Sequence, residues 1–336
     1  MHYRSRIYNA FYDMFLEKGY EFHVVSNEYQ HVDFPIRYKK HEKPFSYSEY
    51  KGIISDIRPD VCISFLHLKD KIFLPVILYC RFKRIPIIYW GHGVNNSDSD
   101  NYLKNSLFKI IHSLCNALIL YSPEQLKFVS KKNHKKTFIA KNTLDFSDVD
   151  LSKLRIPSEV KKVYGIKEKK IVLYISRILP YKKLNVLLDI LQSQKDVGLV
   201  VVGSGIDGRQ RRIIDENDNF YYLGEKYGSA VDEIYQMGDV FSTPGHIGLA
   251  LNQAMFWGKP VVLLKGNHAP EIIYLKNGYN GYVCDTEDEL KQTILRLCSD
   301  NELLSVMSAN ARLTFDKEMG IDKMFQGFMN AIDYCL

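Results

Sequence analysis

Two cations, Arg177 and Lys182, have the clearest potential for chemistry, and they stand five positions apart in the run SRILPYK. The run follows an apolar stretch and precedes a helical pattern, so the carboxyl end of a strand and the start of a helix meet there. Arginine offers a planar fork to phosphate oxygens, and lysine offers a point charge. The spacing predicts a site for a diphosphate group, and the alternative interpretation is a solvated basic loop.

A glycine-rich turn, GSGIDG at 203–208, also follows a strand and matches the dinucleotide-binding pattern G-x-G-x-x-G. The turn follows the second strand of its domain instead of the first, and neither Asp218 nor Glu225 ends a strand at the required distance. These two features argue against a nicotinamide cofactor. We predict instead a tight turn in which Gly203 and Gly205 let a ligand approach the backbone.

A third pattern is TPGHIGLALNQAMFWGKPVV at 243–262. A strand is predicted to end at Thr243, a Pro/Gly turn follows, and a helix from Leu249 to Trp257 ends before Gly258. Free N–H groups at the start of a helix favour negative charge and hydrogen-bond acceptors. This turn is therefore expected to face phosphate and sugar hydroxyls.

Apolar, β-branched runs alternate with helical patterns along the chain, which predicts an α/β protein with parallel sheets. A helix is predicted to begin at Ser122-Pro123-Glu124. The polar stretch 146–168 predicts a link between two domains, 1–145 and 169–319, and the last helix, 320–336, is expected to pack on the first domain. Strands are predicted at 20–26, 61–66, 86–91, 117–121, 136–140, 170–176, 197–203, 239–243 and 259–264.

The first domain departs from a doubly wound pattern at its start. Met1 is followed almost at once by a helical pattern with Ile7, Phe11 and Phe15, which ends at Gly19. A doubly wound domain normally opens with a short apolar strand that becomes central to the sheet. We therefore expect the first strand to lie upstream of Met1.

Composition limits the classes of function. The 336 residues are 46% hydrophobic and 25% charged, and no apolar run approaches the ~20 residues of a spanning helix. The six cysteines form no zinc-binding pattern and predict reduced thiols in the cytoplasm. The net charge of +6 gathers at 127–141 and 81–84. This charge predicts either a surface that binds an anionic membrane or a solvated turn. No accompanying motif indicates binding of nucleic acid.

The order of these motifs resembles the second domain of the family 4 retaining glycosyltransferases, which share the GT-B fold of two facing Rossmann-like domains. The resemblance rests on SRxxxxK at 176–182, VVVGSG at 200–205, the pattern at 243–262 and PEIIYLKNGYNGYV at 270–283. The first half agrees more loosely, through HYR at 2–4, IIYWGHG at 87–93 and Asn142-Thr143 before the link.

The resemblance implies a role for each matched residue. Arg177 and Lys182 would hold the diphosphate of the donor, and His92 would lie near the anomeric carbon, unless it is a structural histidine at a strand end. Lys226 would line the nucleobase pocket, and Glu271 would face donor hydroxyls or stabilise the start of a helix. The other matched positions around the donor are Gly203, Gly205, Gly245, His246, Gly248 and Gln253.

The chain also departs from the family pattern. The family usually has two glutamates at the positions that Gly245 and Gln253 hold here. Glutamine can still bond ribose hydroxyls as donor and acceptor, whereas glycine offers only its backbone. The difference, in a PGxIGL turn, predicts a variant donor pocket, and the alternative is a sugar-nucleotide-binding subunit without turnover.

The function implied is transfer of a sugar from a UDP- or GDP-sugar to a hydroxyl of a glycan or lipid-linked glycan, with retention. A role in bacterial surface polysaccharide, such as capsule or O-antigen, and a peripheral position at the inner membrane surface are also implied. No metal or other cofactor is expected, and Asp98-Ser99-Asp100 is a weak match to a metal-binding pair. A sugar-nucleotide epimerase and a nicotinamide oxidoreductase remain as alternatives.

Overall fold

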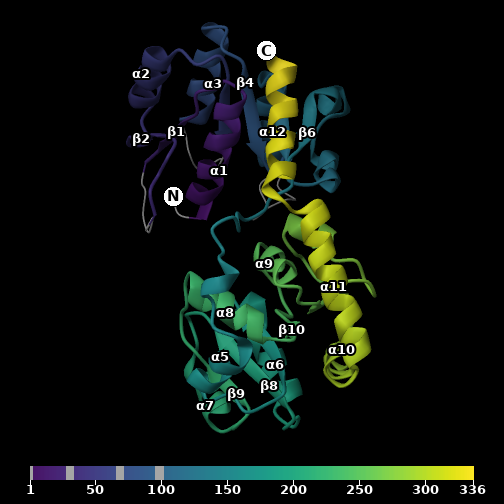
Figure 1. Cartoon of the computed structure of the whole chain (residues 1–336). Helices are drawn as coiled ribbons and strands as arrows, with labels where there is room; N and C mark the ends of the chain where they lie inside the picture. The colour runs from purple at the N-terminus through teal and green to yellow at the C-terminus, as the bar shows by residue number, and fades with distance from the viewer. Residues whose placement is uncertain (1–2, 28–33, 66–71, 95–101) are drawn as a thin grey trace. The chain divides into compact units, whose positions relative to one another are not determined.

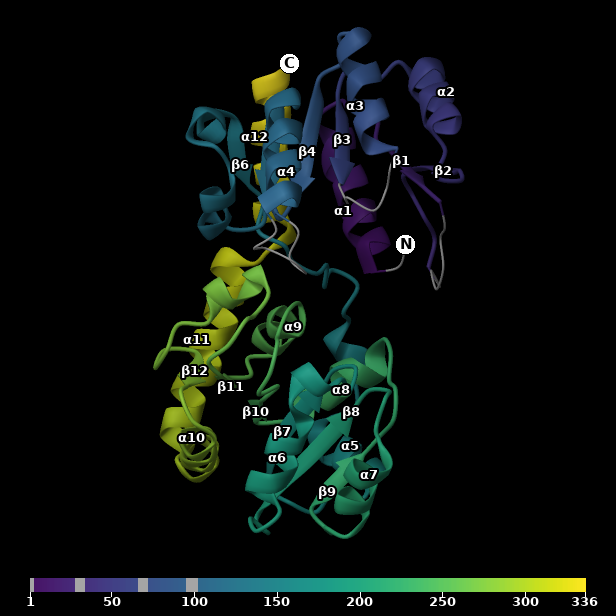
Figure 2. The same ribbon diagram turned by 180° about the vertical axis from the view of Figure 1, so that it is seen from behind.

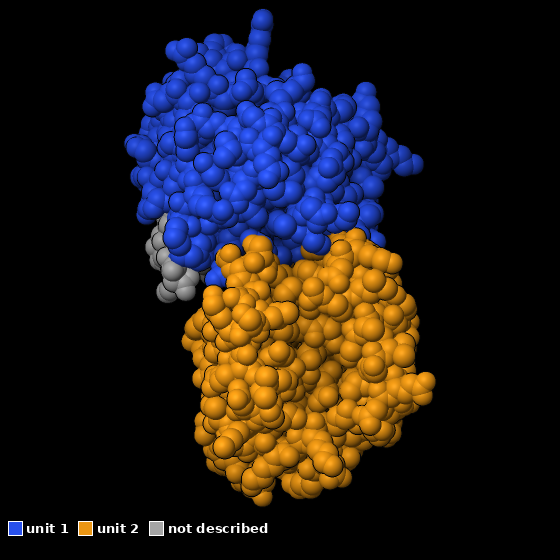
Figure 3. All heavy atoms as spheres, in the orientation of Figure 1, with its two compact units in different colours: residues 1–145, 320–336 blue, residues 146–319 orange. Residues whose placement is uncertain are grey.

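The chain consists of two compact units, each with parallel sheets between helices. Unit 1 comprises Met1–Asp145 and Gly320–Leu336, and unit 2 comprises Phe146–Met319. Figure 3 shows the two units in different colours. The parallel α/β architecture confirms the predicted fold class. The computed structural model describes residues 3–27, 34–65, 72–94 and 102–336.

The strands of unit 1 form two parallel sheets, a pair β1-β2 and a four-stranded sheet in the order β3-β4-β5-β6. β4 and β5 are buried along their whole length, as expected of parallel strands covered on both faces. The strands are β1 (His23–Ser26), β2 (Lys39–Glu42), β3 (Cys62–Phe65), β4 (Ile87–Gly91), β5 (Ala117–Leu120) and β6 (Thr137–Ile139).

Helices cover both faces of the four-stranded sheet. Ile88 and Trp90 of β4 share a core with α1 and α12, which lie in front in Figure 1. Ile87 and Tyr89 share the opposite core with α3 and α4, which lie in front in Figure 2. This alternation follows from the two-residue period of a strand. The helices are α1 (Tyr3–Glu17), α2 (Tyr47–Ile57), α3 (Phe73–Phe82), α4 (Tyr102–Leu114) and α12 (Ile321–Cys335), with 3₁₀ helices η1 (Pro123–Phe128) and η2 (Lys131–Lys136).

The last helix, α12, packs on unit 1 although it comes from the far end of the chain. Its apolar face, which includes Phe325 and Phe328, is buried against α1 and the sheet. Gly327 allows a close approach to β6, because a Cβ at this position would lie 2.4 Å from the carbonyl oxygen of Ile139.

Unit 2 contains one six-stranded parallel sheet in the order β12-β11-β10-β7-β8-β9. This is the doubly wound order, in which the chain starts at the centre, runs to one edge, and then returns to build the other half. The order reverses between β7 and β10, which are neighbours in the sheet. The strands are β7 (Lys170–Ile175), β8 (Val197–Val202), β9 (Phe220–Tyr222), β10 (Val240–Phe241), β11 (Val261–Leu264) and β12 (Gly281–Cys284).

Helices cover both faces of this sheet as well. α6 and α10 share one buried core with the strands, and α8, α9 and α11 share the other. The helices are α5 (Pro157–Tyr164), α6 (Leu184–Leu191), α7 (Gly208–Asp215), α8 (Ser229–Met237), α9 (Ala250–Phe256), α10 (Glu287–Ser299) and α11 (Asn301–Glu318), with 3₁₀ helices η3 (Leu151–Lys153), η4 (Pro180–Lys182) and η5 (Pro270–Tyr274).

The segment 146–168, which was interpreted as a link, lies in unit 2 and contains η3 and α5. α5 packs on α8 and buries Val160. The guanidinium of Arg155 donates hydrogen bonds to both carboxylate oxygens of Glu233, at 2.6–3.1 Å. The segment is polar because it covers the surface of unit 2 and adds little to its core.

Most of the elements expected from the sequence are present. All nine predicted strands occur at their predicted places, while β2, β9 and β12 were not predicted. The helix expected at Ser122 is wrong in type, because the residues after it form the 3₁₀ helix η1. The expected strand upstream of Met1 stays a prediction. His2 and Asp98-Ser99-Asp100 lie outside the described residues.

Two further findings concern the described residues only. None of their helices combines the length and the apolar character that crossing a membrane requires. The six cysteines are all free thiols.

Candidate functional site

The sheet order of unit 2 gathers the predicted motifs at one edge. In a doubly wound sheet, the ligand crevice opens at the carboxyl ends of the two strands between which the order reverses. These strands are β7 and β10. The loop after β7 contains Arg177 and Lys182, and the loop after β10 contains Gly245 and His246. Residues about 65 positions apart in the sequence therefore become neighbours.

The two loops are joined by backbone hydrogen bonds. The N–H of Gly245 donates to the carbonyl of Lys182 at 3.1 Å, and the N–H of His246 donates to the carbonyl of Tyr181 at 3.0 Å. In the opposite direction, Lys182 Nζ donates to the carbonyl of His246 at 2.6 Å. The lysine is therefore held in place by the backbone of the loop that faces it.

This contact explains why a glycine stands at position 245. A Cβ there would lie 2.0 Å from the carbonyl oxygen of Tyr181 and 2.8 Å from the carbonyl carbon of Lys182. Real Cβ atoms do not approach backbone atoms so closely, so any side chain at this position would push the two loops apart. Backbone packing alone therefore excludes a glutamate at position 245, whatever ligand the site binds.

The glycine-rich turn after β8 packs against the same loop. Gly203 has a φ of +140°, and a Cβ on it would lie 1.9 Å from the carbonyl oxygen of Ser176. Gly205 has a φ of +97°, and its Cβ would lie 2.6 Å from the carbonyl oxygen of Ile178. The N–H of Ile178 donates to the carbonyl of Ser204 at 2.7 Å. These glycines give room to the neighbouring backbone, a packing role that the sequence did not reveal.

A fourth loop, after β11, completes the arrangement through His268. Its Nδ1 accepts a hydrogen bond from the N–H of Ile247 at 3.3 Å, and its Nε2 donates to the carbonyl of Leu264 at 2.9 Å. The nearby His246 Nδ1 donates to the carbonyl of Asn267 at 2.8 Å. Burial lowers the pKa of His268, so this imidazole stays neutral and keeps its acceptor nitrogen. His268 was not predicted as a site residue.

The electrostatics of the site are dominated by two cations. Arg177 is exposed, and Lys182 is half-buried beside it. Burial lowers the pKa of Lys182, and the neighbouring charge of Arg177 lowers it further. Neither cation forms an ion pair with a carboxylate in the part of the chain that the structure describes. Two neighbouring positive charges without a paired carboxylate among the described residues have the chemistry that an anion-binding site needs.

Other predicted residues lie around this core of four loops. Gly248 faces Ala269: a Cβ added at Gly248 would lie 3.5 Å from the Cβ of Ala269. Gln253 is half-buried on α9. Glu271 lies on η5, where it is only 4% exposed, so its carboxylate is not an open surface group.

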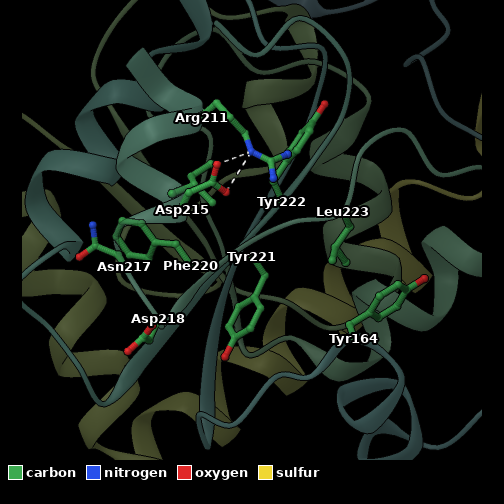
Figure 4. Close-up of a pocket in the computed structure, with 10 residues that line it drawn as sticks. Tyr164, Arg211, Asp215, Asn217, Asp218, Phe220, Tyr221, Tyr222 and Leu223 are labelled. Carbon is green, nitrogen blue, oxygen red and sulfur yellow. Dashed lines mark hydrogen bonds and ion pairs between the residues drawn. The ribbon is translucent and has the colours of Figure 1, made fainter. Parts of the chain in front are cut away.

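Lys226 is placed differently from the other candidates. Its Nζ lies 5.9 Å from the centre of the Tyr164 ring, and Tyr164 lines a groove of about 310 Å³ at the β9 edge of the sheet. Figure 4 shows this groove, where Arg211 is paired with Asp215 and the tyrosines of β9 stand beside it. None of the predicted site residues lines the groove.

In unit 1, His92 follows directly after β4, at the carboxyl end of the sheet. Its ring centre lies 4.6 Å from that of Tyr121, which follows β5. Gln125 Nε2 donates to His92 Nδ1 at 2.9 Å. Arg4 donates to the Tyr121 hydroxyl at 3.0 Å and stacks on the ring of Trp90, 4.4 Å from its centre. Gln125 and Arg4 were not predicted as site residues.

No group of three or more His, Cys, Asp or Glu side chains among the described residues is arranged to hold a metal ion. The site as described consists of cations, backbone groups and imidazoles.

Residues 158–314 match the family model described as Glycosyl transferases group 1. The matched region covers most of unit 2, including all four loops.

The solved structures that resemble this chain share its whole fold. A glycosyltransferase from Rickettsia africae superposes with a TM-score of 0.72 at 16% identity, over 98% of this chain and 93% of that one. HepE of Anabaena, solved with UDP, gives a TM-score of 0.71 at 16% identity, over 88% and 86% of the two chains. The fold is GT-B.

The curated relatives match this chain over only part of their length. An uncharacterized glycosyltransferase of Methanocaldococcus jannaschii, MJ1069, is 26% identical over 71% of this chain and 65% of the relative. Spore coat protein SA of Bacillus subtilis is 26% identical over 47% of this chain and 46% of the relative. The chain therefore spans less than two thirds of the length of either one.

The packing at position 245 gives the first testable prediction. Gly245→Ala should lower the free energy of unfolding of this GT-B protein by about 2 kcal/mol or more, because the new Cβ overlaps the backbone of the facing loop. Urea unfolding measures the change. Gly208→Ala is the matched control, because a Cβ there meets nothing within 4 Å. A loss below about 0.5 kcal/mol for Gly245→Ala would show that the loops are not packed in this way.

Proposed function

We propose that this chain transfers a sugar from a nucleoside diphosphate donor, a UDP- or GDP-sugar, to a hydroxyl of a glycan or lipid-linked glycan. The observation that carries the proposal is the pair Arg177 and Lys182, two adjacent cations without an acid at the switch point of a doubly wound sheet. The family match of residues 158–314 supports this choice. The UDP and UDP-glucose complexes of the Anabaena neighbour support UDP as the nucleotide.

The chemistry that the site supports is assistance to the leaving group. As the bond between the sugar and the diphosphate breaks, negative charge develops on the phosphate oxygens, and fixed cations stabilise it. Lys182 is well suited to this task because its ammonium is partly desolvated and is held by the carbonyl of His246. The two cations would supply charge stabilisation that does not call for a metal ion.

We propose retention of the anomeric configuration, with the acceptor hydroxyl attacking on the face that the diphosphate leaves. His92 would contact the sugar, and Gln253 would bond the ribose hydroxyls. Gly245 brings no carboxylate to the donor, so hydroxyl recognition at this point would fall to backbone groups and to His246. If no sugar transfer is found, the glycine at position 245 would favour the alternative, a subunit that binds a sugar nucleotide without turnover.

A surface on unit 1 supports a membrane-bound acceptor. The side chains of Leu74, Leu78 and Phe82 recur every four residues on α3, and they are 37%, 51% and 79% exposed. Such a stripe is an exposed apolar face at helical spacing. The residues that follow it include the exposed cations Lys83 and Arg84.

Hydrogen bonds bring a second group of cations to the same place. Arg81 Nη1 donates to the carbonyl of Leu114 at 2.8 Å, and Lys136 Nζ donates to the carbonyl of the next residue, Cys115. The end of α3 and the basic helix η2 therefore meet at the end of α4. Burial lowers the pKa of Lys136, and the nearby charges of Arg81 and Lys132 lower it further.

We propose that this combined surface binds an anionic bilayer, with Phe82 and Leu78 in the interface and the lysines against lipid headgroups. It would place unit 1 on the inner face of a membrane, where lipid-linked acceptors of bacterial surface polysaccharides such as capsule or O-antigen are built.

The catalytic proposal predicts large effects from two single substitutions. Arg177→Ala and Lys182→Ala should each lower kcat by ~10²-fold or more, the scale expected for the loss of one group that stabilises transition-state charge. Turnover of UDP- and GDP-sugars with a glycan acceptor measures the loss. Arg209→Ala, which removes an exposed charge on α7, is the control and should leave kcat unchanged. Losses of tenfold or less in both variants would mean that the diphosphate is held elsewhere.

The membrane proposal predicts a charge-dependent interaction. The triple variant Lys131→Glu, Lys132→Glu, Lys135→Glu should bind vesicles of phosphatidylcholine and phosphatidylglycerol at least tenfold more weakly, since each basic residue contributes about 1 kcal/mol near such a surface. Phe82→Ser should also weaken binding. Sedimentation with vesicles measures both. The reversal Lys167→Glu, Lys169→Glu, Lys195→Glu in unit 2 is the control, and equal binding by all variants would eliminate the proposal.

A further inference from the structure

The side chain of Gln125 has an orientation that its own hydrogen bonds determine. Gln125 lies on η1 and is 7% exposed. Its Oε1 accepts from the backbone N–H of Tyr121 at 2.9 Å and from that of Ser122 at 3.2 Å. Backbone N–H groups only donate, so the atom that receives them must be the amide oxygen. The amide nitrogen is therefore the atom that faces His92.

This orientation fixes the proton on the imidazole. The amide nitrogen of Gln125 lies 2.9 Å from His92 Nδ1. An amide NH₂ group donates and does not accept, so Nδ1 must be the acceptor. In a neutral imidazole one nitrogen accepts and the other carries the proton. The proton of neutral His92 is therefore on Nε2.

The backbone around His92 is also held firmly. The next residue, Gly93, has a φ of +75°, and its N–H donates to the hydroxyl of Tyr89 at 2.9 Å. A Cβ on Gly93 would lie 3.4 Å from a side-chain carbon of Leu120, so the turn is packed against β5. The ring position thus depends on the turn after β4, while the ring tautomer depends on Gln125.

We propose that Gln125 is a positioning residue that keeps His92 in the Nε2–H tautomer, so that His92 donates a hydrogen bond to a sugar oxygen and does not accept a proton. The proposal rests on the sugar transfer proposed above. It specifies the direction of the hydrogen bond that His92 makes in that reaction, and it assigns the cause to a residue that need not touch substrate.

The variant Gln125→Glu separates this role from a structural one. A glutamate has nearly the same shape and can accept the same two backbone N–H groups, so the fold around η1 is kept. Its second oxygen accepts where the amide donated, so it draws the proton of neutral His92 to Nδ1 and leaves Nε2 as an acceptor.

The spectroscopic test uses ¹⁵N-histidine NMR, with the His92 signals assigned by their loss in His92→Gln. In the unsubstituted protein above pH 8, Nε2 should carry the proton and Nδ1 should not. In Gln125→Glu the two assignments should exchange. A protonated Nδ1 in the unsubstituted protein would overturn the proposal, whether or not the protein transfers sugar.

The kinetic test uses the pH profile of kcat. Above pH 8, Gln125→Glu should transfer at least tenfold more slowly, because Nε2 has lost its proton. As the pH falls, the imidazolium carries protons on both nitrogens, so the rate should recover toward that of the unsubstituted protein. Among the described residues, the ionisable groups at this turn include Tyr121 beside the His92 ring, Arg4 on the Tyr121 hydroxyl and Tyr89 on the N–H of Gly93, and all are retained in the variant.

Gln210→Glu is a matched control for both measurements. Gln210 is also 7% exposed, and its Oε1 accepts from the N–H of Asp207 in the same capping arrangement, but its NH₂ faces Asn185 and no histidine. It should change neither the His92 signals nor the profile. A uniform loss for Gln125→Glu at all pH values would indicate a structural role and would overturn the proposal. Absence of transfer by the unsubstituted protein would contradict only the proposed function.

Discussion

The site depends on one close approach, between the backbone at Gly245 and the backbone of Tyr181 and Lys182. These residues follow β10 and β7, the two strands between which the sheet order reverses. The absence of a side chain at Gly245 lets two backbone hydrogen bonds form, and it brings the carbonyl of His246 within 2.6 Å of Lys182 Nζ. A partly desolvated ammonium is thereby held in position before any ligand arrives. Pre-organised charge of this kind does not have to reorganise during a reaction.

The same constraint accounts for the chain's departure from the usual family pattern. A glutamate at position 245 would need space that the facing loop occupies. The two glycines after β8 show a similar compromise, because they too accommodate the backbone of the loop that holds Arg177. In unit 2, packing between the loops therefore determines the positions of the candidate side chains Arg177 and Lys182. In unit 1 the controlling contact is instead a side chain, Gln125, whose amide determines the tautomer of His92.

Much of the fold could be predicted from the sequence because its strands are buried on both faces. Continuous apolar runs such as VGLVVV, which forms β8, have no other common explanation in an alternating chain. β2 was missed because its residues, KKHE, are polar and mostly exposed. The helix α5 was not recognised because only Val160 of its eight residues is buried.

The candidate site could be predicted only where its parts are close in sequence. The spacing of Arg177 and Lys182 indicated an anion site, but the hydrogen bond from Lys182 to His246 crosses 64 positions. The partnership of Gln125 with His92 crosses 33 positions, and the predicted helix start at Ser122-Pro123-Glu124 gave no indication of it. His268 was missed for the same reason, since its role depends on the loop after β10.

Binding of a nucleoside diphosphate by the loops of unit 2 can be measured by thermal unfolding with UDP, GDP, dTDP, CMP and NADPH. A ligand at about 100 times its dissociation constant adds ~2.7 kcal/mol to the free energy of unfolding, which is easily measured. We predict stabilisation by UDP or GDP, its loss in Lys182→Ala, and no effect of NADPH. Unchanged unfolding with every nucleotide, or equal stabilisation of the lysine variant, would show that these loops do not hold the diphosphate.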